Sequence, residues 1–224
     1  MKEIGKIAAV GFVVLGLSVS VLDAGIVEIS LTAEITYIRD PDYFDGQLQL
    51  GDIMTGSYKY ESTTPDSNPM LSVGDYEHYS SPYGISLTAG GFVFQTDPDN
   101  VNFLVEVVNN HYASPTEDNY GIISYNNLPL SNGVLVAGIE WHLSDTSGTA
   151  LSSDALPTTP PVLDDWSYSW GMLIHTGPHT GHVAIEADVT SVELVPEPAT
   201  LFLLGLGTLL VLRSRRSTKG QHRA

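Results

Sequence analysis

The chain has 224 residues, of which 42% are hydrophobic and none is cysteine, so it is long and apolar enough for one substantial packed domain. The lack of cysteine excludes disulfides, thiolate metal sites and thiol catalysis. The 26 acidic residues outnumber nine basic ones, and the formal net charge of −17 argues against nucleic acid as a partner because it repels phosphate backbones.

The first 24 residues have the three-part layout of a secretory signal peptide. Lys2 and Lys6 precede an apolar run over residues 7–17, and small residues follow that run. We expect signal peptidase to cut after Ala24, with Ser20 as the alternative. The sequence therefore predicts that the protein is exported across the inner membrane and that its folded part begins near residue 25.

Residues 25–194 repeatedly alternate apolar and polar side chains, which is the period of half-buried β-strands. Turn-forming Gly, Pro, Asp and Asn residues separate these segments. No stretch of this region has convincing helical periodicity. The segments that we expect to be strands are 28–37, 47–50, 53–61, 84–89, 91–95, 103–108, 121–125, 134–143, 166–174 and 183–194.

The last of these segments changes parity, because Ile185 occupies an odd position and Val192 an even one. We therefore expect a β-bulge near Thr190. The many short amphipathic strands predict an all-β fold, an antiparallel and jelly-roll-like β-sandwich of residues 25–194. An N-terminal signal helix and a C-terminal hydrophobic helix are expected to flank this β-sandwich domain.

Asp97, Asp99 and Asn100 lie close together in a turn and offer the oxygen ligands that calcium prefers. Calcium is therefore the candidate cofactor. The stretch does not follow the twelve-residue EF-hand pattern. Asp and Asn also form turns without any metal, and this alternative stays open.

His175, His179 and His182 form a second candidate metal group, because imidazoles bind zinc, copper or nickel. The intervening glycines and proline favour a tight turn over a helix. Such a turn can gather two of the imidazoles. The alternative is a set of exposed loop histidines.

Trp166, Tyr168 and Trp170 share one strand parity, and a row of exposed aromatic rings can stack on sugars. Met172 and Ile174 continue the same parity, which favours the alternative that the row belongs to the core. The chain has no nucleophile elbow, phosphate-binding loop or dinucleotide fingerprint, so no motif identifies a catalytic residue.

The C-terminal end, residues 195–224, has three consecutive parts. Pro196, Glu197 and Pro198 precede the apolar stretch 199–212, and five of the nine basic residues follow it. The apolar stretch is shorter than the roughly 20 residues that span a bilayer comfortably, so it predicts a marginal membrane helix. The basic residues should keep its end cytoplasmic; the principal ones are Arg213, Arg215 and Arg216.

This arrangement resembles the PEP-CTERM sorting signal of Gram-negative bacteria that make extracellular polysaccharide. The resemblance implies that an exosortase recognises Pro196, Glu197 and Pro198 and removes the tail. It also implies a membrane-anchored precursor that is later placed at the cell surface or outside the cell. The resemblance covers about the last 30 residues and implies a sorting route without any biochemical activity.

Between the two targeting ends, residues 25–196 hold 23 acidic residues and two basic ones, Arg39 and Lys59, for a formal charge of −21. We expect this acidic domain to be non-catalytic and to bind extracellular polysaccharide or other envelope components. The alternative is a secreted hydrolase acting on glycans, which needs two carboxyl groups placed across a cleft.

Overall fold

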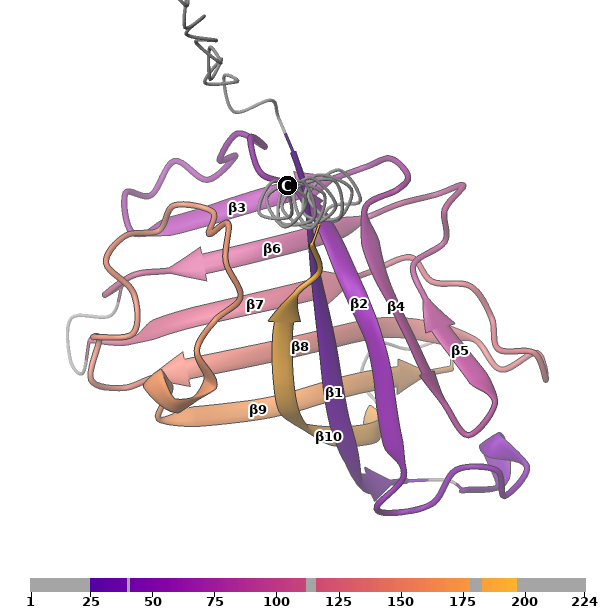
Figure 1. Cartoon of the computed structure of the whole chain (residues 1–224). Helices are drawn as coiled ribbons and strands as arrows, with labels where there is room; N and C mark the ends of the chain where they lie inside the picture. Colours follow the sequence, from indigo (N-terminus) through magenta and orange to yellow (C-terminus); the bar gives the residue numbers. More distant parts are fainter. Residues whose placement is uncertain (1–24, 40, 112–115, 178–182, 197–224) are drawn as a thin grey trace, which may run out of the picture.

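The computed structural model describes residues 25–39, 41–111, 116–177 and 183–196, which form ten strands and two short 3-10 helices (Figure 1). All ten strands belong to one sheet, and every neighbouring pair is antiparallel. The prediction of an antiparallel all-β fold is confirmed. The elements are β1 (Ile26–Ile38), η1 (Pro41–Phe44), β2 (Ile53–Glu61), β3 (Val73–His78), β4 (Gly84–Ala89), β5 (Phe92–Gln95), β6 (Phe103–Val108), β7 (Asp118–Ser124), β8 (Val136–Asp145), η2 (Leu163–Asp165), β9 (Tyr168–Thr176) and β10 (Val183–Leu194).

The strand order is β3-β6-β7-β8-β9-β10-β1-β2-β4-β5, and the sheet curls so that its two halves face each other. In Figure 1, β6, β7 and β9 run across the view while β1, β2 and β4 cross in front of them. The hydroxyl groups of Tyr58 in β2 and Tyr120 in β7 lie 2.9 Å apart, although four strands separate β2 from β7 in the sheet. Burial raises the pKa of both hydroxyls, so they stay protonated and hold the halves together.

The expected sandwich of two separate sheets is not seen, because one continuous hydrogen-bonded ladder joins all the described strands. The turn between the halves is made at β10 and β1, where register shifts interrupt the ladder. Such bulges bend a strand and increase its twist. A single sheet can therefore fold over its own core without a break.

The bulge predicted near Thr190 is confirmed. Thr32 pairs with Ser191 and Ala33 pairs with Val189, which leaves Thr190 without a partner residue in β1. The Thr190 hydroxyl instead donates to the carbonyl oxygen of Thr32 at 3.2 Å. The extra residue explains why the apolar residues of β10 change parity.

Four strands, β2, β4, β6 and β10, begin and end where the sequence predicts them. The predicted strand 47–50 is wrong, because this segment forms turns and only Leu48 of its four residues is buried. The strand β3 was not predicted. Its inward-facing positions include Gly74 and His78 next to Tyr76, so the sequence shows no apolar alternation there.

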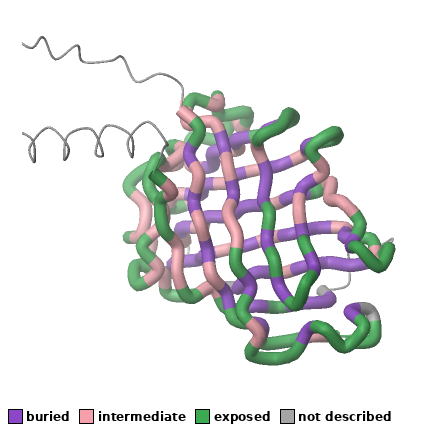
Figure 2. The backbone as a smooth tube through the Cα atoms, turned by 45° about the vertical axis from the view of Figure 1, so that its right-hand side comes forward, coloured by how far each residue is buried: buried purple, intermediate pink, exposed green. Residues whose placement is uncertain are grey.

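The core lies between the two halves, and the alternation of buried and exposed residues along the strands is visible in Figure 2. Trp141 of β8 is fully buried, and its ring lies 6.3 Å from that of Tyr58 and 6.0 Å from that of Tyr120. Phe44 of η1 and Leu48 are buried in the same core cluster.

Both ends of the described body lie on adjacent strands. The Val195 amide donates to the carbonyl oxygen of Glu28 at 2.8 Å, and the Gly25 amide donates to the Ser62 hydroxyl at 3.3 Å. The predicted signal helix and the predicted C-terminal hydrophobic helix lie outside the described residues. Within the part of the chain that the structure describes, no helix has the length and apolarity needed to cross a bilayer.

Candidate functional site

The outer side of the half formed by β1, β2, β4 and β5 carries aligned hydroxyl groups, and we call it the hydroxyl face. The register of β1, β2 and β4 places side chains of the same type opposite one another in two neighbouring rows. The first row is Thr32, Thr55 and Thr88, and the second is Ser30, Ser57 and Ser86. All six side chains are exposed or half-buried.

Several of these hydroxyls donate their only hydrogen to the protein itself. Ser57 donates to the Glu28 carboxylate at 2.7 Å, Ser30 donates to the Glu193 carbonyl at 3.2 Å, and Thr88 donates to the Thr55 carbonyl at 3.2 Å. The remaining lone pairs of these oxygens are acceptors. The hydroxyl face is therefore suited to a ligand that carries many O–H donors.

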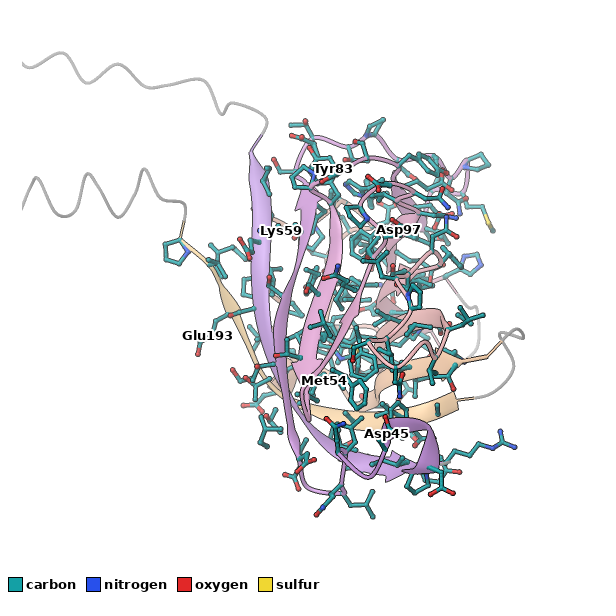
Figure 3. All side chains as sticks on the ribbon, turned by 90° about the vertical axis from the view of Figure 1, so that its right-hand side faces the viewer. Asp45, Met54, Lys59, Tyr83, Asp97 and Glu193 are labelled. Atoms are coloured by element: carbon teal, nitrogen blue, oxygen red, sulfur yellow. The ribbon has the colours of Figure 1, made fainter. Side chains whose placement is uncertain are left out.

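A hollow of about 240 Å³ opens beside the serine row. Lys59 contributes its only cation, and the Lys59 ammonium lies 3.2 Å from a Glu28 carboxylate oxygen. Lys59 and Tyr83 lie towards the same end of this half of the sheet (Figure 3). The residues that line the hollow are Ser57, Lys59, Ser81, Pro82, Tyr83, Gly84, Ile85, Ser86, Gln95, Thr96 and Pro98.

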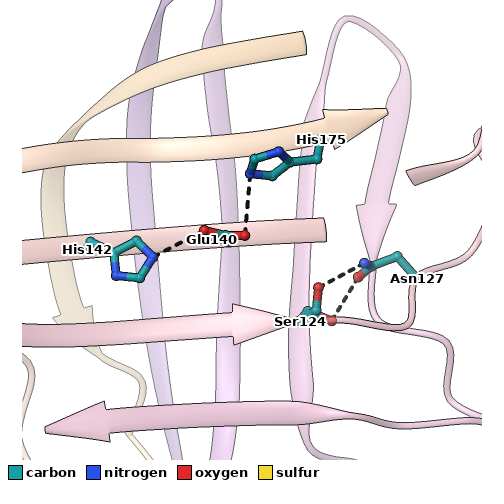
Figure 4. A network of polar contacts seen from close by, with 5 residues as sticks. All are labelled: Ser124, Asn127, Glu140, His142 and His175. Carbon is teal, nitrogen blue, oxygen red and sulfur yellow. Dashed lines mark hydrogen bonds and ion pairs between the residues drawn. The ribbon is translucent and has the colours of Figure 1, made fainter. Parts of the chain in front are cut away.

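A carboxylate flanked by two imidazoles lies on the outer side of the other half (Figure 4). One Glu140 oxygen is 3.3 Å from His142 Nε2, and the other is 3.3 Å from His175 Nε2. The hydrogen bond from His142 lowers the pKa of Glu140, burial opposes this shift, and the charge of His175 supports it. The buried His175 ring makes no well-aligned hydrogen bond within the described part of the chain.

Ser124 and Asn127 form a separate buried contact on the inner side of β7 (Figure 4). The Ser124 hydroxyl donates to the Asn127 side-chain oxygen at 2.7 Å and lies 2.8 Å from the Thr96 hydroxyl. Glu140 lies on the outer side, so Ser124 is not aligned with its imidazoles. This arrangement fixes the segment after β7 and does not form a nucleophile–histidine pair.

The predicted calcium residues Asp97, Asp99 and Asn100 form a turn closed by its own hydrogen bonds. The Asp99 amide donates to the Asp97 carboxylate at 3.0 Å, and the Asn100 amide donates to the Asp97 carbonyl at 3.1 Å. Turn formation thus accounts for these residues. Among the residues that the structure describes, no group of three or more His, Asp or Glu side chains is arranged to hold a metal ion.

The predicted histidine group is described only at His175, which lies in β9. His179 and His182 lie outside the described residues.

The predicted aromatic row does not occupy one face. Gly171 has a φ of +75°, and the register places Ser169 opposite Leu143 and Gly171 opposite His142, so the chain bulges at Trp170. Tyr168 is 57% exposed, whereas Met172 and Ile174 are buried. Trp166 precedes β9 and packs half-buried against the core, and the Trp170 side chain lies outside what the structure describes.

Of the predicted sorting residues, Pro196 is described and exposed directly after the last residue bonded to β1. Glu197, Pro198, Arg213, Arg215 and Arg216 lie outside the described residues.

The hydroxyl face and its hollow were not predicted. The sequence does show polar residues alternating along each strand, but the alignment of the hydroxyls depends on the pairing of strands that are about 25 residues apart.

Comparison with known proteins bears on the C-terminal end of the chain. No curated protein and no solved structure matches the chain. The family model of the PEP-CTERM protein-sorting motif matches residues 194–216. This match begins at the last residue of β10, so the sorting motif follows the folded body without a spacer. The chain is therefore a PEP-CTERM sorting-domain-containing protein, exported and sorted by an exosortase.

Proposed function

We propose that the mature body is a non-catalytic protein of the cell surface or extracellular matrix that binds extracellular polysaccharide through the hydroxyl face. The observation that carries this proposal is the pair of aligned rows, one of threonines and one of serines, across β1, β2 and β4. Polysaccharides present a regular series of O–H donors, and the two rows present a regular series of acceptors.

The spacing between neighbouring hydroxyls within each row supports this ligand. Neighbouring strands lie about 4.7–4.9 Å apart, which is comparable to the length of one sugar unit in an extended chain. A polysaccharide lying across the strands therefore meets a new pair of hydroxyls at each unit. The open outer surface of a sheet suits such an extended ligand better than it suits a compact one.

The alternative function, glycan hydrolysis, is less well supported. Glycosidases need two carboxyl groups on opposite sides of the scissile bond. Among the described residues that line the hollow, none is acidic. The nearby Glu28 carboxylate is already bridged to Lys59 and hydrogen-bonded to Ser57. Because Glu28 is engaged in these contacts, they favour binding of a glycan over its hydrolysis.

The proposed route to the surface starts with signal peptidase, which we expect to cut after Ala24 or alternatively after Ser20. The C-terminal apolar segment then holds the precursor in the membrane until exosortase acts near Pro196, Glu197 and Pro198. The position of Gly25 and Val195 on adjacent strands is compatible with this route, because both processing sites are then reached from the same side.

The proposal is tested by co-sedimentation of the full-length chain, kept in detergent, with exopolysaccharide purified from the producing host. The double variant Thr55→Val and Thr88→Val keeps the β-branched shape but removes two hydroxyls. A hydrogen bond contributes about 0.5–1.5 kcal/mol, so we expect binding to weaken about tenfold.

Thr36→Val is the matched control, because Thr36 lies in the same strand β1 beyond the two rows. This control should bind as the wild type does. Retention of full binding by the double variant, or failure of the wild type to bind, contradicts the proposal.

A further inference from the structure

We propose that the hollow beside the serine row is a subsite for one uncharged sugar ring. This inference rests on the proposed function and deepens it, since it adds the chemical class of sugar to the binding of a polysaccharide chain. The hollow and the rows share Ser57 and Ser86, so a chain lying on the hydroxyl face reaches the hollow directly.

The walls of the hollow suit the C–H face of a sugar ring. Pro82, Tyr83 and Pro98 contribute apolar surface to its lining. Tyr83 is held in place by its hydrogen bond to the Glu61 carboxylate and by the His78 ring, whose centroid is 5.0 Å away. A fixed aromatic ring loses little conformational freedom when it contacts a ligand.

Three polar side chains in the hollow have capacity for new hydrogen bonds. Ser81, Ser86 and Gln95 line it, and none of these side chains makes a hydrogen bond to another described residue. An amide and two hydroxyls can both donate and accept. A few convergent polar groups between apolar walls are typical of small-molecule sites.

The charges select an uncharged ring. Lys59 is one of two basic residues in a body of formal charge −21, and its ammonium is already paired with Glu28 at 3.2 Å. A uronic acid would have to displace Glu28 and enter against the field of the whole body. A neutral sugar accepts a hydrogen bond from the ammonium without breaking the pair.

The size of the hollow limits the part of the ligand that enters it to a single sugar ring. Its volume of about 240 Å³ is below the roughly 300–1,000 Å³ of sites for drug-sized molecules.

The test is a titration of the full-length chain in detergent, followed by NMR, with glucose, galactose and mannose and with glucuronate and galacturonate. We expect at least one neutral sugar to bind more tightly than either uronate. Ser86→Trp fills the hollow and Lys59→Met removes the ammonium, and each should weaken that binding about tenfold. Ser152→Trp is the control, because Ser152 is exposed in the loop after β8 and belongs neither to the hydroxyl face nor to the lining of the hollow.

Binding of neutral sugars that Ser86→Trp weakens and Ser152→Trp leaves unchanged supports the proposal. Tighter binding of the uronates, absence of binding by all five sugars, or full binding by Ser86→Trp overturns it. Sugar binding and exopolysaccharide co-sedimentation are separate measurements. A chain that sediments with polysaccharide but binds no free sugar overturns only this inference, whereas the reverse result overturns only the proposed function.

Discussion

Asp118 and Asp145 are buried side by side, as directly paired residues of β7 and β8. Hydrogen-bond donors from neighbouring loops compensate their charges. Asp118 accepts from the amides of Asn110 and Leu151, and Asp145 accepts from the amides of Ser147, Thr149 and Ala150 and from the Ser147 and Ser167 hydroxyls. The Ser147 and Ser167 hydroxyls and the Thr149 amide hold the pKa of Asp145 well below its usual range.

This pKa direction predicts how stability depends on Asp145. A carboxylate whose pKa is lowered by folding stabilises the protein at pH values above its unfolded pKa of about 3.9, and this contribution is lost as the pH falls further. Asp145→Asn should lower the free energy of unfolding by about 2 kcal/mol at pH 7 and by less at pH 3, measured by urea denaturation. The exposed Asp164→Asn is the control. An equal loss at both pH values would show that the carboxylate charge is not the cause.

At the scale of the strands, the alternation of apolar and polar residues predicted the strands whose inward side chains are mostly large and apolar. In β6, Phe103, Val105 and Val107 face the core, and the strand matches the prediction. The pattern failed at β3, whose inward positions include a glycine and a histidine, and at β9, where a bulge reverses the parity of the aromatic row. A bulge could be predicted only where apolar residues continue on both sides, as around Thr190.

The candidate site could not be predicted from the sequence for a related reason. In the sequence, each serine of the row is simply a polar residue of its own strand; the three are Ser30, Ser57 and Ser86. Their common row depends on the pairing of β1 with β2 and of β2 with β4, which no local pattern contains. The same holds for Glu140 and His175, which are brought together by the pairing of β8 with β9.

The bulge itself can be tested as an element. Deleting Thr190 removes the extra residue and leaves Val189 opposite Ala33 and Ser191 opposite Thr32, so β10 loses the bend and the added twist of the bulge. We expect the free energy of unfolding to fall by about 1–3 kcal/mol in urea denaturation. Deletion of Thr158, which is exposed in the loop before η2, is the control and should cost less. Unchanged stability after deletion of Thr190 would contradict a structural role for the bulge.

For the whole molecule, the sorting motif is attached at one end of the folded body. The two ends of the described body, Gly25 and Val195, lie next to the adjacent strands β1 and β2. The sorting motif begins at Leu194, the last residue of β10, so the motif directly follows the folded domain. Residues 25–196 are more acidic than the formal charge of −17 suggests, because seven of the nine basic residues lie outside this range.

The most direct test of export followed by exosortase sorting is mass spectrometry of the protein purified from its native host. We predict a chain that begins at Gly25 and lacks the apolar and basic residues 199–224. Alanine in place of Pro196, Glu197 and Pro198 should leave the tail attached and the protein in the membrane fraction. A wild-type protein that retains its C-terminal arginines, or a variant that is processed as the wild type is, would contradict export followed by exosortase sorting.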